Sequence, residues 1–350
     1  MARDPHETDT TSGPRMDRRR FGALAAGTVG GLLMPAGVNA QGLRKMRFVT
    51  PFNFSLSYST IFYAKAAGFF EKEGLDVEVL NGKGAATAAQ LVIAGQAEVA
   101  RTGGANYITV RVDSGAPLIS IATIAQVSPF FMVSAPDRPI RSAQDMKGKT
   151  IGVASLGGSM EGTLNLMLRG GGVEGSTVER VRVADVPASF GLIEAKRIDG
   201  FMASVSSVVK ILAAVPKAHT VGIDDGLPGQ VYVASPDALQ KNEDLYVRFL
   251  RAAHRSASAI LDAKELEPII KAIGGAFEVP GLDDMPTAIA DLTQNSRTWA
   301  AKGRENLLRN VPEQWADAVK VMRETGMIKK DADPATLYTN ALRDKAVGAP

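Results

Sequence analysis

The chain has 350 residues, 45% of them hydrophobic and 22% charged, and it contains no cysteine. This composition is typical of a globular protein rather than of a disordered or membrane-embedded one. Without cysteine the chain has no disulfide, no thiol nucleophile, no cysteine-ligated metal and no acylated-cysteine lipid anchor. Residues 1–40 carry five basic and four acidic side chains, so the remainder has a net charge of about +2. That balance predicts no nucleic-acid partner.

Residues 1–40 have the features of an export signal. A basic segment at residues 18–21, Arg-Arg-Arg-Phe, precedes an apolar stretch over residues 22–34, and small residues follow up to Ala40. This order is that of a cleavable signal peptide, and Arg-Arg-x-Phe resembles the twin-arginine type. A membrane anchor is disfavoured because the stretch is shorter than the roughly 20 residues that span a bilayer. We expect cleavage after Ala40 and a periplasmic mature protein; a start at Met16 is an open alternative.

Hydrophobic runs rich in Ile, Val and Phe alternate with helical patterns, which predicts an α/β fold with mainly parallel strands. The first half contains a strand, a helix and a strand, and the second half contains the same series. We expect these elements at residues 47–50, 58–73 and 75–80, and again at residues 150–154, 160–169 and 178–183.

Three landmarks recur about 100 residues apart in the two halves: Phe48 with Ile151, Gly74 with Gly172, and Glu98 with Asp199. We interpret the chain as two lobes of one design. The alternative is that any α/β protein reuses helix, glycine and strand.

Two extended segments, residues 129–135 and 230–235, should connect the lobes. The first lobe then comprises residues 41–134 and 235–350, and the second comprises residues 135–234. Beyond Pro236 the pattern is helical, and these helices should complete the first lobe. Asp333, followed by Pro334, fits the start of a last helix. The other C-terminal helices are expected at residues 243–263, 265–273, 283–302 and 312–325.

Residues 63–78, Tyr-Ala-Lys-Ala-Ala-Gly-Phe-Phe-Glu-Lys-Glu-Gly-Leu-Asp-Val-Glu, carry a resemblance that continues in residues 94–100 and 145–153. In order and spacing they resemble the periplasmic solute-binding proteins of ABC importers for nitrate, sulfonates, taurine and thiamine-type pyrimidines. The resemblance implies a type II periplasmic-binding-protein fold, with two α/β lobes hinged about a ligand cleft. It also implies a small-molecule ligand and an ABC permease in the inner membrane as partners. Glu98 stands where the family usually has Asp, which puts the local hydrogen bonding in question.

In such an architecture the cleft is lined by loops at the carboxyl ends of strands, where helix N-termini point inward. Their free N–H groups and partial positive charge suit a carboxylate, sulfonate or phosphate. Six loops rich in glycine and hydroxyl groups meet this description, at residues 52–57, 82–87, 101–106, 155–161, 187–189 and 203–206. The expected ligand-binding residues are Asn53, Phe54, Ser55, Gly84, Ala85, Arg101, Thr102, Gly103, Asn106, Gln126, Gly158, Ser159, Met160, Ser189 and Ser204.

Arg101 is the sharpest candidate, because a guanidinium facing a cleft can bind an acid group through two hydrogen bonds. A salt bridge to a neighbouring acid is an equal alternative. Gly82 and Gly84 resemble half of a dinucleotide fingerprint, but Thr87 replaces the third glycine, so helix capping is favoured. Ser159 lies in an incomplete nucleophile-elbow pattern, and a capping role is favoured over a nucleophilic one.

Six aromatic residues fall in or beside the cleft loops, and we expect two of them to contact ligand. Trp299 and Trp315 have apolar neighbours at helical spacing, which favours core packing. Charged residues around the Gly-Phe-Phe signature could contact the permease, although a solvated helix face is the simpler interpretation. The six aromatic residues are Phe52, Phe54, Tyr107, Phe130, Phe131 and Phe190, and the charged residues are Lys65, Glu71, Lys72 and Glu73.

Beyond residue 40 the histidines are His219 and His254, and neither has a second ligand at metal-binding spacing. No catalytic triad can be assembled. The family includes pyrimidine-forming enzymes whose activity goes with a cysteine cluster and a histidine, both missing here. We therefore expect a monomeric solute-binding protein without metal or cofactor, which captures a small anionic molecule. An exported enzyme or a ligand sensor on the same scaffold is the alternative.

Overall fold

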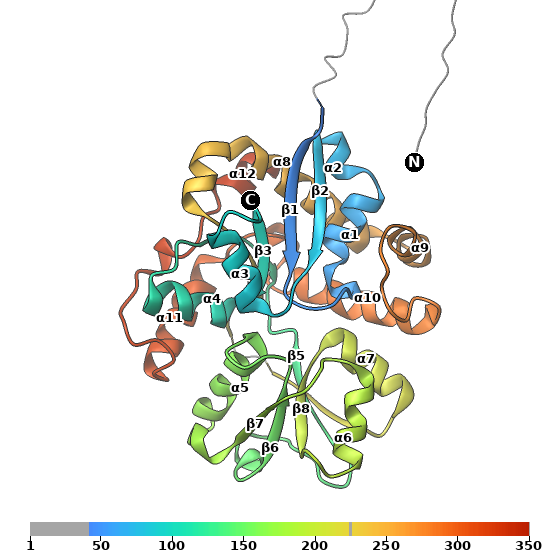
Figure 1. Cartoon of the computed structure of the whole chain (residues 1–350), viewed down its shortest axis with the longest axis vertical. Helices are drawn as coiled ribbons and strands as arrows, with labels where there is room; N and C mark the ends of the chain where they lie inside the picture. Colours follow the sequence, from blue (N-terminus) through green and yellow to red (C-terminus); the bar gives the residue numbers. More distant parts are fainter. Residues whose placement is uncertain (1–41, 224–225, 350) are drawn as a thin grey trace, which may run out of the picture. The chain divides into compact units, whose positions relative to one another are not determined.

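The computed structural model describes residues 42–223 and 226–349 and contains two mixed β-sheets covered by helices (Figure 1). The export signal expected at residues 1–40 lies outside the described residues. Each sheet has five strands. The sheet built first along the chain, with its helices, is called lobe 1 here, and the other is called lobe 2.

In the lobe 1 sheet, β1 runs parallel to both of its neighbours, β2 and β3. Strand β10 lies between β3 and β4 and runs antiparallel to both. Side chains of successive β1 residues point to opposite faces, as in any strand. Phe48 therefore packs in one apolar cluster and Val49 in another, on the two faces of the sheet. The strand order is β2 (Leu75–Asn81), β1 (Arg44–Thr50), β3 (Val99–Gly103), β10 (Gln230–Ala234) and β4 (Ile119–Ala125).

The lobe 2 sheet repeats this plan, with β6 parallel to both of its neighbours and β5 antiparallel to both of its own. The register repeats as well, because Phe48 faces Val99 in lobe 1 and Ile151 faces Gly200 in lobe 2. The strand order is β7 (Glu179–Arg182), β6 (Thr150–Val153), β8 (Gly200–Ser204), β5 (Phe130–Ser134) and β9 (His219–Gly222).

Glu98, which stands where the family usually has Asp, accepts the same hydrogen bond as Asp199, its counterpart in lobe 2. The Arg47 amide donates to Glu98 Oε2 at 2.5 Å, and the Thr150 amide donates to Asp199 Oδ2 at 3.0 Å. The longer glutamate side chain thus ties the start of β3 to β1 in the way that aspartate ties β8 to β6.

The sheets correct the expected lobe boundaries at both crossings. Strand β5 pairs with β8 and β9, so residues 130–134 belong to lobe 2. Strand β10 pairs with β3 and β4, so residues 230–234 belong to lobe 1. Both segments are buried, and buried backbone amides need partners. Each segment therefore pairs as a strand in the sheet of the lobe that the chain is entering, instead of forming an unpaired connection between the lobes.

One predicted helix of lobe 1 is two helices. Residues 58–73 form α1 (Ser59–Ala66) and α2 (Phe69–Lys72), separated by Gly68 at φ +68°. Glycine adopts this left-handed conformation without the steric penalty of a β-carbon. The helix interpretation was correct in type but missed the turn inside it.

The C-terminal helices pack on lobe 1, as expected. Trp299 and Trp315 are both buried there, in the clusters on the two faces of the sheet. Together with α3 (Ala85–Ile93) and α4 (Gly104–Ser114), these helices cover the sheet (Figure 1). They are α8 (Pro236–Asp262), α9 (Glu267–Ala276), α10 (Met285–Trp299), α11 (Pro312–Glu324) and α12 (Ala341–Val347).

The expected start of the last helix is wrong. Asp333 Oδ1 accepts a hydrogen bond from the Ala335 amide at 3.0 Å, but it caps only a 3₁₀ turn, Pro334–Thr336. The helix that follows begins at Ala341.

In lobe 2 the helices are α5 (Ser159–Gly170), α6 (Phe190–Glu194) and α7 (Val205–Ala214). None of the described helices is long and apolar enough to cross a bilayer.

The lobes contact each other on two sides, α4 with α5 and α10 with α7 (Figure 1). On the first side, the Gly103 amide donates to Ser159 Oγ at 2.9 Å. On the second side, Asn295 Nδ2 donates to Ser206 Oγ at 3.1 Å, and Lys210 Nζ donates to the Pro280 carbonyl at 2.9 Å. The lobes are therefore closed on each other.

Candidate functional site

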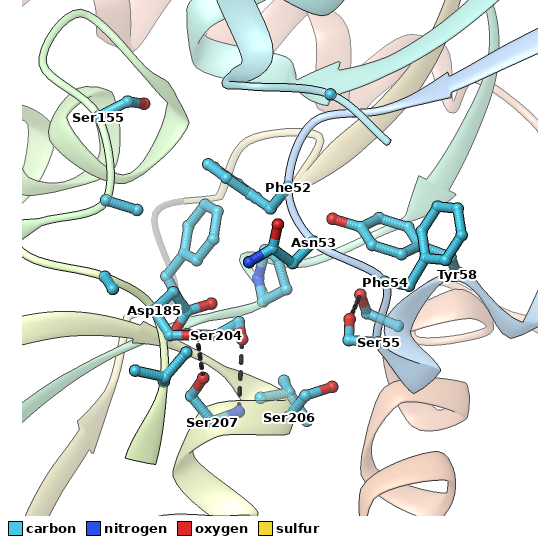
Figure 2. A pocket seen from close by; sticks show the side chains of 18 of the residues that line it. Phe52, Asn53, Phe54, Ser55, Tyr58, Ser155, Asp185, Ser204, Ser206 and Ser207 are labelled. Atoms are coloured by element: carbon cyan, nitrogen blue, oxygen red, sulfur yellow. Dashed lines mark hydrogen bonds between the residues drawn. The ribbon is translucent and has the colours of Figure 1, made fainter. Parts of the chain in front are cut away.

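A cavity of about 330 Å³ lies between the two lobes. Lobe 1 contributes the loop after β1, the turn before α3 and one side chain of β3. Lobe 2 contributes the loop after β7 and the first turn of α7. Figure 2 shows side chains from both lobes projecting into this space, with Asn53 near its centre. These positions follow the carboxyl ends of parallel strands, where ligand sites form in α/β proteins.

Six of the fifteen expected ligand-binding residues line the cavity: Asn53, Phe54, Ser55, Gly84, Arg101 and Ser204. The other nine are not among its lining residues: Ala85, Thr102, Gly103, Asn106, Gln126, Gly158, Ser159, Met160 and Ser189. Several of these are occupied by other contacts.

Ser159 and Gly103 form a contact between the lobes and do not line the cavity. Ser159 Oγ accepts from the Gly103 amide, so it contributes to lobe contact rather than capping α5, whose N-cap is Gly158. Asn106 Nδ2 donates to Thr102 Oγ1 at 3.4 Å within lobe 1.

Two other expected binding residues are held by backbone groups. Ser189 Oγ donates to the Ala184 carbonyl at 2.6 Å. Gln126 is completely buried. Its Nε2 donates to the Asn306 carbonyl at 2.5 Å, and its Oε1 accepts from the Lys302 amide at 2.6 Å. Gln126 therefore fixes the chain to the C-terminal region just before it crosses to lobe 2.

Arg101, in the middle of β3, is a buried cation at the cavity wall. Its Nε donates to Gln230 Oε1 at 3.3 Å, and its Nη1 donates to the Ser57 carbonyl at 2.5 Å. The guanidinium carbon lies 5.0 Å from the centre of the Tyr58 ring, a cation–π distance. Only 3% of the residue is exposed.

Burial lowers the pKa of Arg101 by desolvation, and the groups that counteract this shift are the Tyr58 and Tyr232 hydroxyls. No carboxylate of the described residues forms an ion pair with Arg101 or shifts its pKa. The structure therefore gives no support to the salt-bridge alternative. A buried guanidinium without a counterion is costly, and an anionic ligand would supply the missing charge.

Asp185 is the acidic side chain of the cavity wall, and it was missed in the sequence. It follows β7, and its Oδ1 accepts from the Ser204 amide at 3.1 Å. Its carbonyl accepts from Ser207 Oγ at 3.0 Å. Figure 2 shows Asp185 beside Ser204 and Ser207, facing the same space as Asn53. Desolvation raises the pKa of Asp185, while hydrogen bonds from Ser204 and Ser207 and the charge of Lys210 lower it. The rule that pointed to residues 187–189 could have included Asp185, because it too follows a strand.

Three other missed residues come from segments without a loop signature. Tyr58 lies at the end of a 3₁₀ turn, Lys210 on α7 and Asn295 on α10. All three line the cavity. No local pattern marks them, because helix packing between the lobes brings them there.

Three of the six aromatic candidates line the cavity, where two were expected: Phe52, Phe54 and Phe130. Phe54 also packs edge-on against Phe62, with ring centres 5.0 Å apart. The other three, Tyr107, Phe131 and Phe190, lie within the lobes. Across residues 42–223 and 226–349, no three His, Asp or Glu side chains are grouped to hold a metal ion.

The charged residues around the Gly-Phe-Phe signature are partly engaged in ion pairs. Lys65 Nζ lies 3.0 Å from Asp76 Oδ1 and 3.3 Å from Glu71 Oε1. Glu73 Oε2 lies 2.9 Å from Arg251 Nη1. These pairs fit a solvated helix surface, and a permease contact there remains a prediction.

Comparisons with known proteins agree with this architecture. The model of the family described as "NMT1/THI5 like" matches residues 56–265. "Putative binding protein YtlA" of Bacillus subtilis (strain 168) is 23% identical over 302 residues, which are 83% of this chain and 86% of that protein.

Two solved structures share the fold. The alkanesulfonate-binding protein SsuA from Xanthomonas axonopodis pv. citri, bound to MOPS, has a TM-score of 0.63 at 13% identity, covering 86% of this chain and 99% of that one. The periplasmic nitrate-binding protein NrtA from Synechocystis PCC 6803 has a TM-score of 0.64 at 13% identity, covering 87% and 88%. These likenesses confirm the predicted two-lobed fold of periplasmic binding proteins.

Proposed function

The chain belongs to the NMT1/THI5-like family, and we propose that it is the extracytoplasmic solute-binding component of an ABC importer. In this role it captures a small organic anion, of sulfonate or carboxylate type, between its lobes. It then delivers the solute unaltered to a permease in the inner membrane. We also propose that it acts as a monomer in the periplasm.

The similarities support a binding role. YtlA is named as a binding protein, and the two solved structures are named for binding alkanesulfonate and nitrate. Both of these solutes are anions. Their sizes and shapes differ, so the names favour a charge class for the solute rather than one compound.

The observation that carries the proposal is Arg101, a cation buried in the cavity wall without an acidic partner among the described residues. Its position beside the Ser57 carbonyl and the Tyr58 ring holds the guanidinium in one orientation. A carboxylate or sulfonate can accept hydrogen bonds from such a preoriented group at little further entropic cost. Closure of the lobes over the ligand excludes water and strengthens these charge-assisted bonds.

The proposal is tested by replacing Arg101 with Gln in residues 41–350. We expect the wild type to bind at least one alkanesulfonate or alkanoate of two to six carbons, detected by thermal unfolding and quantified by calorimetry. A ligand at 100 times its Kd adds roughly 2.7 kcal/mol to the free energy of unfolding. Arg101→Gln should weaken that binding at least tenfold, because the ligand's acid group loses its counterion.

Arg248→Gln is the matched control. Arg248 forms a surface ion pair with Asp244 at 2.8 Å and does not line the cavity, so the control should bind normally. Equal affinity of Arg101→Gln and the wild type would contradict the assignment of Arg101. Recovery of a chemically altered ligand would contradict the transport role.

A further inference from the structure

We infer that the solute is a monoanion that ends in a neutral carboxamide, with an acid group at one end and a –CONH2 group at the other. The acid faces Arg101 of lobe 1, and the carboxamide lies between Asp185 and Lys210 of lobe 2. This inference rests on the proposed function and specifies the solute that the same cavity accepts.

Asp185 and Lys210 place a hydrogen-bond acceptor and a hydrogen-bond donor of lobe 2 in one cavity wall. The charge of Lys210 lowers the pKa of Asp185, so the two groups interact through space. In the part of the chain that the structure describes, however, they form no ion pair or hydrogen bond with each other. A ligand group that both donates and accepts can therefore bridge them.

Both side chains keep hydrogen-bonding capacity for a ligand. Asp185 Oδ1 accepts from the Ser204 amide at 3.1 Å, and the hydroxyls of Ser204 and Ser207 act as further donors. A carboxylate can accept about four hydrogen bonds, so one position remains. Lys210 Nζ donates to the Pro280 carbonyl at 2.9 Å. An ammonium carries three hydrogens, so two remain.

A neutral group fits this wall better than a second charge. A ligand ammonium would pair with Asp185 but would meet the like charge of Lys210. A second acid would pair with Lys210 but would meet Asp185 and also Asp291, whose pKa is raised by the charge of Asp185. Like charges repel strongly where closure excludes water. A carboxamide donates an N–H to Asp185 and accepts from Lys210 through its carbonyl, and it adds no charge.

The remaining charged side chains of the cavity wall do not change this balance. Lys83 and Arg182 are exposed, so water and salt screen their charges. Arg101 is buried and has no acidic partner among the described residues, so it is the cation left for the acid end. The solute thus brings its one negative charge to Arg101 and a neutral group to the wall where Asp185 and Lys210 offset each other.

The two ends of such a solute have separate places in the cavity. The guanidinium carbon of Arg101 lies 5.0 Å from the centre of the Tyr58 ring. Figure 2 shows Tyr58 and Asp185 on opposite sides of Asn53. A linear molecule in a cavity of about 330 Å³ can therefore reach Arg101 with one end and Asp185 with the other.

The test compares acids that share a propanoate chain and differ only in the terminal group. Succinamate carries the carboxamide, and 4-oxopentanoate carries a methyl ketone of the same shape that only accepts hydrogen bonds. The terminal group is isopropyl in 4-methylpentanoate, a second acid in succinate and an ammonium in 4-aminobutanoate. A second series, with one more methylene and built on glutaramate, covers a longer solute. Calorimetry on residues 41–350 should show that at least one carboxamide binds at least tenfold more tightly than every other member of its series.

Two substitutions assign the two hydrogen bonds. Asp185→Asn should weaken the carboxamide at least tenfold, because an amide N–H then faces the ligand N–H, and should leave the methyl ketone unchanged. Lys210→Met should weaken the carboxamide and the ketone at least tenfold relative to the isopropyl acid. If Lys210 acted only through its bond to Pro280, the substitution would weaken every acid by the same factor, and that result would overturn its assignment.

Asp137→Asn and Lys217→Met are the matched controls, because both residues are exposed in lobe 2 and lie outside the cavity. Both should bind every acid as the wild type does. If in each series another acid binds as tightly as the carboxamide, the inference is overturned while the proposed anion-binding function stands. If no acid of either series binds, the inference is overturned, and the alkanesulfonates tested with Arg101→Gln decide the proposed function. The comparison on the wild type needs no variant, so an unstable variant would not prevent the test.

Discussion

Asp291 shows how a single buried residue can oppose folding at neutral pH. Its Oδ1 accepts from Asn295 Nδ2 at 2.6 Å, whereas its Oδ2 is buried without a hydrogen-bond partner in the described structure. Burial, with a smaller contribution from the charge of Asp185, raises the pKa of Asp291 to about 6. Ser206, Lys210 and Asn295 counteract part of the shift.

The sign of this effect on stability follows from proton linkage. In the unfolded chain the pKa is 3.8, so between pH 3.8 and about 6 the folded state retains a proton that the unfolded state has lost. Stability therefore falls as the pH rises through this window, and the penalty is complete above about pH 6.

We expect Asp291→Asn to become progressively more stable than the wild type between pH 4 and pH 7. The difference in the free energy of unfolding should grow by about 2–3 kcal/mol, because the amide never ionises. Urea unfolding at several pH values measures it. Asp145→Asn is the control with opposite sign, since the Arg141 and Ser142 amides lower the pKa of this exposed carboxyl. A difference between Asp291→Asn and wild type that does not vary with pH would contradict the prediction.

At the scale of elements, equivalent helices of the two lobes end in the same left-handed turn, but the turn is made by different residues. Gly95 follows α3 at φ +66°, and Lys196 follows α6 at φ +53°. Both are exposed. The left-handed conformation costs about 1 kcal/mol for a residue with a β-carbon and nothing comparable for glycine.

We expect Gly95→Lys to lower the free energy of unfolding by about 1 kcal/mol, because it introduces this strain. Lys196→Gly should leave stability unchanged or slightly raised, because relief of strain offsets the greater entropy of glycine in the unfolded chain. Urea unfolding of both single variants and of the double variant measures these changes in the free energy of unfolding. Equal losses from both changes would contradict the prediction, because relief of strain at Lys196 would then not offset the entropy of glycine.

The same scale shows where element prediction succeeds and fails. Strands and long helices were found because their apolar periodicity is local. The break at Gly68 was missed because the apolar pattern continues across it, and Asp333 was assigned to the wrong helix because its cap is satisfied by a 3₁₀ turn. The sheet membership of residues 130–134 and 230–234 was misassigned for another reason. An extended apolar segment does not show which of two sheets supplies its hydrogen-bond partners.

At the scale of the whole molecule, the two lobes approach each other closely at Gly103 and Ser159. A β-carbon at Gly103 would lie 2.3 Å from Ser159 Oγ and 2.4 Å from Ser159 Cβ, closer than real atoms approach. The backbone of Gly103, at φ −72°, suits alanine. A substitution here should therefore disturb the contact between lobes rather than the strand.

We expect Gly103→Ala to hold the lobes apart, which should weaken ligand binding at least tenfold and increase the radius of gyration in small-angle X-ray scattering. The second change Ser159→Gly removes the two clashing atoms and should restore both properties. Gly191→Ala is the control, since a β-carbon there meets open space. If Gly103→Ala binds and scatters like the wild type, closure does not need this contact.

The sequence by itself determined the α/β character, the two similar halves and the family, and it singled out Arg101 as a candidate for ligand binding. These follow from local periodicity, from landmarks repeated along the chain and from the rule that sites follow strand ends. Only the tertiary structure decided which loops reach the cavity, because Gly103 and Ser159 bind each other while Tyr58, Asp185 and Asn295 are brought together from distant segments. The packing of one lobe on the other makes that selection, and no local pattern encodes it.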